Sequence, residues 1–228
     1  NRIGHFAGNI EMYLSKKKNN NTEKYYDIAF YQKYISNKFL AKMWRRKLNV
    51  YPNYFVFPLY FFFKFFSKYF AFMKKHICVT QSFESRDCDN TLDNMSPQIE
   101  FEKKEIEQGF KQLKDFGLDE SSKFVCFIIR DQEYLKKIYP KNDWSYWGYR
   151  DYDVEDFYLA AEELTKLGYY VFRMGKITGK KFKTNNKMII DYSKSEFRND
   201  FLDIFLGANC EFCLSTDVGF DHVPYIFR

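Results

Sequence analysis

Polar residues follow four short apolar runs in the second half of the sequence. Each run has the length and composition of a buried strand: residues 124–129, 169–172, 188–190 and 212–214. Ligands of open parallel α/β sheets bind beyond the carboxyl ends of the strands, so this edge is where chemistry is expected. The residues that this rule selects are Arg130, Asp131, Arg173, Gly175, Asp191, Ser215, Thr216, Asp217 and Gly219.

These residue types suit an anionic ligand. A guanidinium presents a fork of N–H donors that matches phosphate oxygens, and Arg130 and Arg173 each follow a strand. The turn Ser215-Thr216-Asp217-Val218-Gly219 offers hydroxyls and backbone N–H groups that can hold phosphate or ribose. The same five residues are equally consistent with an ordinary capped turn that binds no ligand.

His5 is a candidate general base. The pattern Ile3-Gly4-His5-Phe6 predicts a strand-to-helix turn, with residues 7–14 helical after it. A histidine in such a turn can act as a general base or bind phosphate, although a loop histidine without a chemical role fits equally well.

Motifs for several other chemistries are missing. The sequence has no P-loop, no G-x-G-x-x-G and no G-x-S-x-G, which argues against kinases, ordinary dehydrogenases and α/β-hydrolases. Cys210-x-x-Cys213 resembles half of a zinc or redox site, but no second pair follows at ligand spacing, so no metal is expected. Asp151-x-Asp153 is interpreted as a structural pair that caps a helix.

The elements alternate as in a parallel α/β fold. Helices are expected at 152–167, with Asp153 as N-cap and Gly168 after its end, and at 197–208. In the first half, strands are expected at 26–31 and 77–80 and a basic helix at 38–47. A charged helix at 99–116, ending at Gly117, would bridge two domains. The expected domains are 1–98, on the acceptor side and itself α/β, a bridging helix at 99–118, and 119–228.

Charge is distributed unevenly along the chain. The 228 residues carry a net charge of +6, but residues 16–75 hold 14 basic and only 2 acidic groups. The positive electrostatic field of such a segment attracts phosphates, anionic lipid or acidic polymers. A basic surface that is only solvated is equally consistent with this charge. The odd number of five cysteines and the absence of an apolar leader near the start favour a reducing, cytoplasmic location.

Residues 51–75 form a basic and aromatic segment. Within 51–72, 13 of 22 residues are aromatic, while Lys64 and Lys68 interrupt the run and Pro52 and Pro58 should break its start. A membrane span needs about 20 mostly apolar residues, so a true span is not favoured. The remaining alternatives are a buried helix with snorkelling lysines and an interfacial helix on anionic lipid at the inner membrane face.

Several blocks, in this order, resemble a family of bacterial glycosyltransferases encoded in surface-polysaccharide gene clusters. The resemblance is densest over residues 124–227, and Ile3-Gly4-His5 and Asn37-Lys38-Phe39-Leu40 fit upstream. The main blocks are Phe127-Ile128-Ile129-Arg130-Asp131, Tyr149-Arg150, Gly168-Tyr169-Tyr170-Val171-Phe172-Arg173-Met174-Gly175, Ile190-Asp191-Tyr192-Ser193, Phe201-Leu202-Asp203-Ile204-Phe205-Leu206 and Ser215-Thr216-Asp217-x-Gly219.

The resemblance implies a metal-independent GT-B glycosyltransferase with two Rossmann-like domains. The C-terminal domain would bind the nucleotide-sugar donor, a co-substrate rather than a cofactor, and the N-terminal domain would bind a surface-glycan or lipid-linked acceptor. Arg130 is similar to an arginine that meets the donor diphosphate in fucosyltransferases. The acceptor proton would go to His5, in an acceptor loop with Gly4, or to an unidentified carboxylate.

Two features depart from this pattern. Val218 stands where a small polar residue is expected, and the family continues beyond Arg228, so the C-terminal domain is expected to be truncated. A non-catalytic nucleotide- or glycan-binding module is therefore the alternative. Nucleic-acid binding is not expected, because no RNA- or DNA-binding motif accompanies the basic charge.

Overall fold

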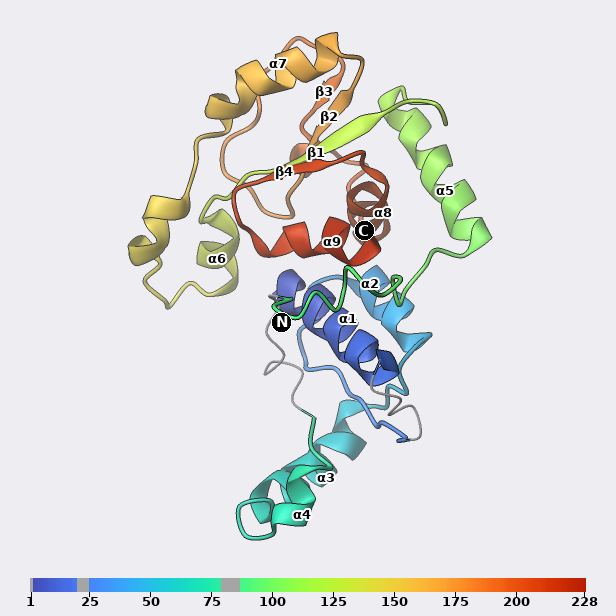
Figure 1. Ribbon diagram of the computed structural model, residues 1–228. Coiled ribbons are helices and arrows are strands. Elements are labelled where there is room, and N and C mark those ends of the chain that lie inside the picture. Colours follow the sequence, from blue (N-terminus) through green and yellow to red (C-terminus); the bar gives the residue numbers. More distant parts are fainter. Residues whose placement is uncertain (1, 20–24, 79–86) are drawn as a thin grey trace. The chain divides into compact units, whose positions relative to one another are not determined.

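The computed structural model describes residues 2–19, 25–78 and 87–228 and divides the chain into two compact units (Figure 1). Unit 1 comprises Asn1–Glu100 with Ile226–Arg228, and unit 2 comprises Phe101–Tyr225. The helix expected to bridge two domains is α5, Lys103–Leu113, extended by the 3-10 turn η2, Lys114–Phe116, and it belongs to unit 2.

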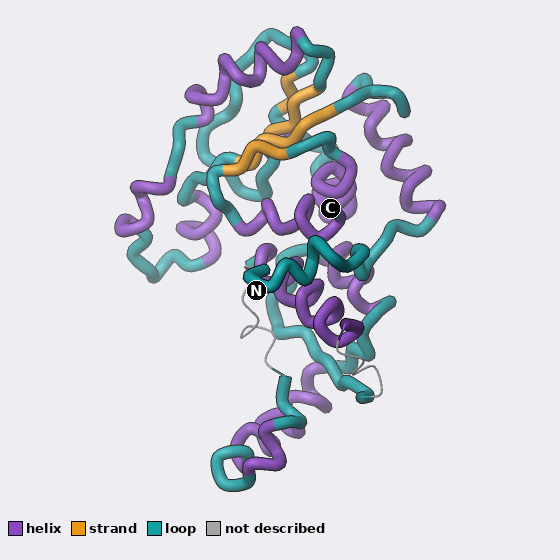
Figure 2. The backbone as a smooth tube through the Cα atoms, in the orientation of Figure 1, coloured by secondary structure: helices purple, strands orange, loops and turns teal. Residues whose placement is uncertain are grey.

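Unit 2 is built on a four-stranded parallel sheet (Figure 2). The strands are β1 (Phe124–Ile128), β2 (Tyr170–Arg173), β3 (Ile189–Ile190) and β4 (Cys213–Ser215), in the order β3-β2-β1-β4. Val125 is opposite Val171, and Cys126 is opposite Cys213. The prediction of an α/β class with a parallel sheet is confirmed, as are all four apolar runs as strands.

Helices cover both faces of this sheet, which explains why all five residues of β1 are buried. Val125, Phe127, Val171 and Ile189 pack with Ala161 of helix α7 (Tyr158–Lys166). On the opposite face, the Cys126 thiol donates to the Leu206 carbonyl of α8, Asp200–Asn209. The remaining helical elements of unit 2 are α6 (Glu133–Ile138), η3 (Ser145–Arg150), η4 (Val154–Phe157), η5 (Tyr192–Lys194), η6 (Gly219–Asp221) and α9 (His222–Phe227), whose last residues fall in unit 1.

The predicted cap residues Asp153, Gly117 and Gly168 are confirmed, whereas the helices predicted to start at 99 and 197 start at Lys103 and Asp200. The Asp153 side chain accepts from the Glu155 backbone N–H and caps η4, the 3-10 turn that leads into α7. Gly117 and Gly168 end their helices with φ of 83° and 89°, a left-handed conformation that glycine adopts without steric cost. The segment predicted as one helix over 152–167 is therefore a capped 3-10 turn followed by an α-helix.

Unit 1 is helical where the structure describes it, which differs from the prediction. It contains α1 (Ile3–Asn19), α2 (Lys38–Arg45), α3 (Asn53–Phe66) and α4 (Ala71–Lys74). The basic helix expected at 38–47 is confirmed as α2, capped by Asn37. Its Trp44 is fully buried and donates from the indole N–H to the Phe6 carbonyl at 3.1 Å.

Three strand predictions in unit 1 need correction. The expected strand-to-helix turn is the first turn of α1, a continuous helix in which residues 6–12 are all buried. The expected strand at 26–31 is reduced to one isolated bridge between Ala29 and Val50. Of the expected strand at 77–80, residues 77 and 78 are not in a strand, and 79 and 80 lie outside the described residues. The described part of unit 1 thus lacks the parallel sheet predicted for the N-terminal domain.

The aromatic segment forms α3 and α4, and only one of its two prolines acts as expected. The helix begins directly after Pro52, which stands at its N-cap, but it continues through Pro58. Burial is also the wrong alternative, because Val56 alone is buried among the residues of these two helices. Within the described residues, no helix combines the length and hydropathy that a membrane crossing requires.

Candidate functional site

The predicted residues of unit 2 lie in the loops at the carboxyl ends of its strands. The loop after β4 is fastened to the end of β1 by Thr216, whose backbone N–H donates to the Ile128 carbonyl at 3.1 Å. The Arg130 backbone N–H donates in turn to the Thr216 hydroxyl at 2.9 Å. The structure therefore brings together Arg130 and the 215–219 turn, 86 residues apart in sequence.

Arg173 is buried at this edge and binds two predicted aspartates. Its side chain is only 3% exposed, and one terminal nitrogen lies 3.3 Å from the Asp191 carboxylate and donates to the Ser193 hydroxyl at 3.2 Å. The other terminal nitrogen lies 3.6 Å from the Asp131 carboxylate. Because these donors face protein acceptors, Arg173 holds the loops together and is not presented to a ligand.

Gly175 permits the sharp turn after β2. Its φ of 150° is a conformation that residues with a side chain rarely adopt, and an added Cβ would lie 2.5 Å from Cγ2 of Thr178. The Thr178 and Ser193 hydroxyls are 2.9 Å apart, and the Asp131 carboxylate accepts from the Gly179 N–H at 3.0 Å. The 175–180 loop is thus folded back against the residues around Arg173.

Arg130 and Arg150 share one aromatic ring at this edge. The centre of the Trp147 ring lies 5.8 Å from the Arg130 guanidinium and 5.0 Å from that of Arg150, within the range of cation–π attraction. Arg150 also donates to the Asp217 carbonyl at 2.8 Å and pairs with the Asp217 carboxylate. Two cations from sequentially separate segments therefore converge on a single indole.

The Arg130 side chain retains hydrogen-bonding capacity. Its Nε lies 3.3 Å from Oδ1 of Asp151, yet neither of these two buried atoms makes a hydrogen bond. A buried donor without a hydrogen-bonding partner is costly and needs an explanation, and a bound ligand is one. The Nε of Arg173 is likewise buried without a hydrogen bond, so exposure separates the two predicted arginines: the side chain of Arg130 is 13% exposed and that of Arg173 is 3% exposed. Arg130 is therefore the more accessible of the two to a ligand.

The 215–219 turn uses most of its polar groups internally. The Ser215 hydroxyl and the Val218 N–H both donate to the Asp221 carboxylate, each at 3.1 Å. Gly219 begins η6, and Asp217, with φ of 58°, projects a side chain that is 86% exposed. Of the two interpretations of this turn, the structure supports the capped turn.

Sequence reasoning missed three residues at this edge. Trp147 and Arg150 lie in η3, a 3-10 segment without the hydrophobic periodicity that would have placed it. Asp151 is predicted to be part of a capping pair, but of the two side chains only that of Asp153 caps a helix, whereas the Asp151 carboxylate faces Arg130. The dense run of aromatic and basic residues after the first strand is the sequence feature that could have predicted this part of the site.

The predicted acceptor loop belongs to unit 1. Gly4 is buried and His5 is exposed in the first turn of α1, so these residues lie on a helix rather than in a loop. The role of His5 as a general base stays a prediction. No three histidine, cysteine, aspartate or glutamate side chains gather as metal ligands in the part of the chain that the structure describes.

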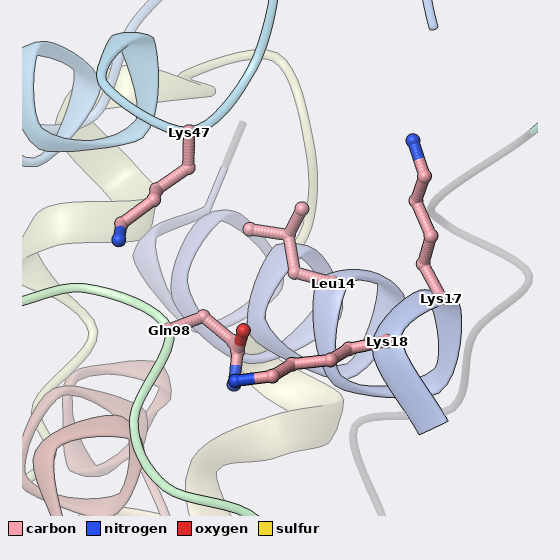
Figure 3. A pocket seen from close by; sticks show the side chains of 5 residues that line it. All are labelled: Leu14, Lys17, Lys18, Lys47 and Gln98. Carbon is pink, nitrogen blue, oxygen red and sulfur yellow. The ribbon is translucent and has the colours of Figure 1, made fainter. Parts of the chain in front are cut away.

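A small pocket in unit 1 is lined by cations. It has a volume of about 180 Å³ and is bordered by Leu14, Lys17, Lys18, Lys47 and Gln98. Lys18 and Lys47 extend toward the Gln98 side, whereas Lys17 points away from it (Figure 3) and pairs with Asp27. Surface lysine side chains alone do not form an anion site, and the buried carboxylate of Glu11, which accepts from the Gln98 backbone N–H at 3.0 Å, adds negative charge beside this pocket.

Comparisons with known proteins return no match among family models, curated proteins or solved structures.

Proposed function

We propose that unit 2 is the donor domain of a metal-independent glycosyltransferase, which transfers a sugar from a nucleotide sugar to a surface-glycan or lipid-linked acceptor. The observation that carries this proposal is the convergence of Arg130 and Arg150 on Trp147 at the carboxyl edge of a parallel sheet. The ordered resemblance of the sequence to glycosyltransferases adds to it.

The two arginines would supply the electrostatic part of catalysis. In sugar transfer the bond between the anomeric carbon and the diphosphate breaks, while the acceptor oxygen bonds to that carbon and loses its proton to a base. The developing charge on the diphosphate needs positive charge or N–H dipoles near it. A buried Arg130 Nε without a hydrogen bond and a backbone fastened to Thr216 support this role for Arg130. His5 remains the candidate base.

Aromatic residues beside the arginines suit a nucleobase. Tyr149 is 78% exposed, and its ring stacks on Trp147 with the ring centres 6.3 Å apart and the planes at 21°. Base–aromatic stacking contributes about 1–3 kcal/mol and tolerates different bases. In a nucleotide the base and the phosphates lie on one molecule. The exposed ring could therefore stack on the base while the two guanidinium groups bind the phosphates.

A non-catalytic binding module is the second candidate, and one observation favours it. Each of the three edge arginines already faces a carboxylate: Asp151 for Arg130, Asp217 for Arg150, and Asp131 and Asp191 for Arg173. These carboxylates offset part of the positive charge that a leaving diphosphate requires. The module predicts nucleotide binding without cleavage of any nucleotide sugar into sugar and nucleotide.

The test is a thermal-shift and calorimetric titration with UDP, GDP, CMP and dTDP. A ligand at 100 times its dissociation constant should stabilise the chain by about 2.7 kcal/mol. Arg130→Ala and Arg150→Ala should each weaken the binding by about tenfold or more, because a hydrogen bond to a charged group contributes about 1.5–3 kcal/mol. Lys111→Ala, an exposed cation on α5, is the matched control and should leave the affinity unchanged.

The outcomes separate the candidates. Binding that depends on both arginines, followed by release of the nucleotide from the matching nucleotide sugar, supports the transferase. The same binding without release favours the module. A folded protein that binds none of the four nucleotides would show that this edge is not a donor site.

A further inference from the structure

The α3–α4 segment of unit 1 exposes an unusually large aromatic surface. Ten large apolar side chains from residue 54 to residue 72 are each between 46% and 72% exposed. They are Tyr54, Phe55, Phe57, Leu59, Phe61, Phe62, Phe65, Tyr69, Phe70 and Phe72. A contiguous exposed patch of this kind marks an interaction site, because soluble proteins otherwise avoid it.

Only one narrow stripe of α3 is covered. Val56 is buried and Tyr60 and Phe63 are partly covered, at positions that share one side of a helix. The Tyr60 ring centre lies 5.7 Å from that of Phe30, and the Phe63 ring centre lies 6.2 Å from that of His76. The exposed aromatic residues occupy the rest of the helix circumference. A helix that is apolar all round requires an apolar environment beyond what this unit provides.

The charge of the segment has a single sign. Residues 51–78 contain no aspartate or glutamate. Four lysines lie among or directly after the aromatic residues, and all four are exposed: Lys64, Lys68, Lys74 and Lys75. A long lysine side chain can lie along apolar surface while its ammonium group stays at a polar boundary. Lys64 shows this arrangement, with its ammonium 5.6 Å from the centre of the Tyr60 ring.

We infer that the α3–α4 segment docks into the interface of an anionic lipid bilayer. The aromatic side chains would enter the boundary between headgroups and acyl chains, and the four lysines would meet anionic headgroups. The 14 residues of α3 measure about 21 Å, shorter than the hydrocarbon core of about 30 Å, so the helix would enter one leaflet and not cross.

A second copy of the chain is a poorer occupant of this surface. A twofold contact would place the same patch against itself and bring two sets of four lysines together without an acidic partner from the segment. An anionic lipid surface would both bury the exposed aromatic side chains and supply negative charge for the four lysines. This inference is independent of the proposed function of unit 2 and would stand if that proposal failed.

The test is flotation of the full chain with vesicles of phosphatidylcholine alone and with 30% phosphatidylglycerol, at low and high salt. We expect binding to the anionic vesicles, weakened at least tenfold by high salt or by omission of the anionic lipid. Phe55→Ser with Phe61→Ser should lower the partition coefficient at least tenfold. Leu159→Ser with Leu167→Ser, two equally exposed leucines in unit 2, should leave it unchanged.

Charge is tested with a matched pair of fourfold variants. Replacement of Lys64, Lys68, Lys74 and Lys75 by glutamine should abolish the preference for anionic vesicles. The same replacement at Lys103, Lys104, Lys111 and Lys114, exposed lysines in and directly after α5, changes the net charge equally and should not abolish it. If both sets weaken binding alike, attraction is through overall charge and the inference is wrong.

Insertion is tested with a fluorescent reporter. Phe61→Trp should show a blue-shifted emission on anionic vesicles and quenching by lipids brominated near the headgroup end of the acyl chain. Absence of binding by the folded wild-type chain, or binding without quenching, would overturn the inference. Sedimentation showing a dimer in buffer that is lost in Phe55→Ser with Phe61→Ser would assign the surface to a second copy instead.

Discussion

At the level of single residues, the strand-end rule located the edge of the sheet but not the partners of its side chains. Arg130 and Thr216 lie together as that rule predicts. Arg173 and Asp191 also meet, but they bind one another in a buried network rather than facing outward. The sequence could not show this, because which of two neighbouring arginines is buried depends on how the 175–180 loop folds.

The Gly175 turn gives a direct test of that network. Gly175→Ala should lower the free energy of unfolding by at least about 2 kcal/mol, because alanine is strained at this φ and its Cβ would lie 2.5 Å from Cγ2 of Thr178. Thr178→Ser removes that methyl group, keeps the hydroxyl, and should recover part of the loss when combined with Gly175→Ala. Urea unfolding of the four chains measures both effects, and a neutral Gly175→Ala would contradict the account.

Asp203 gives a pH-dependent test. Burial raises the pKa of its carboxyl to about 6, although the Arg198 guanidinium, which donates to it at 2.8 Å, opposes the shift. The folded protein therefore keeps a proton on Asp203 at pH values where the unfolded chain, with a pKa near 3.8, has lost it. The stabilising effect of this proton is present below about pH 4 and is lost as the pH rises to about 6 and above.

The asparagine variant isolates this effect from that of the other carboxylates. Asp203→Asn can still accept from the Tyr192 hydroxyl, which lies 3.0 Å from Oδ1, but it does not titrate. The stability of the wild type relative to Asp203→Asn should fall by about 2 kcal/mol between pH 4 and pH 7. Denaturant unfolding at several pH values measures this difference, and a constant difference would show that Asp203 titrates normally in the folded chain.

At the level of elements, prediction succeeded where hydrophobic pattern and capping agreed. The four strands and α8 have apolar runs of the expected length, and Asn199 at the start of α8 accepts from the Leu202 N–H at 2.8 Å. Prediction failed in α1, where Gly4 was interpreted as a turn signal. Gly4 is instead buried in the first turn of α1, and the helix continues through residues 6–12, which are all buried.

The α3 helix shows a different limit of prediction. Its two prolines predicted an interrupted start, yet only Pro58 lies within the helix, where it removes one backbone donor. The aromatic content is equally consistent with a buried helix and with an interfacial helix on lipid. Composition does not show whether other parts of the chain pack over the helix. The exposure of its side chains distinguishes these alternatives.

At the level of the whole molecule, the two proposals place different ligands on different units. The donor edge lies in unit 2, around residues 128–131, 145–152 and 214–219, whereas the aromatic surface lies in unit 1, over residues 53–75. Each ligand should therefore leave its own pattern of amide protection along the chain. That pattern can be read in one experiment, because hydrogen exchange reports local opening segment by segment.

Hydrogen exchange of the full chain, with a bound nucleotide and separately with anionic vesicles, should show these two patterns. A nucleotide at 100 times its dissociation constant should slow exchange at the donor edge by up to about 100-fold. Local unfolding there would first require the nucleotide to dissociate, and bound nucleotide lowers the population of the unfolded form by about that factor. Vesicles should slow exchange over residues 53–75 and leave the 214–219 turn unchanged. Arg130→Ala should remove only the first pattern, and Phe55→Ser with Phe61→Ser only the second. Protection by vesicles over the donor edge, or by nucleotide over α3, would mean that the ligands have been assigned to the wrong surfaces.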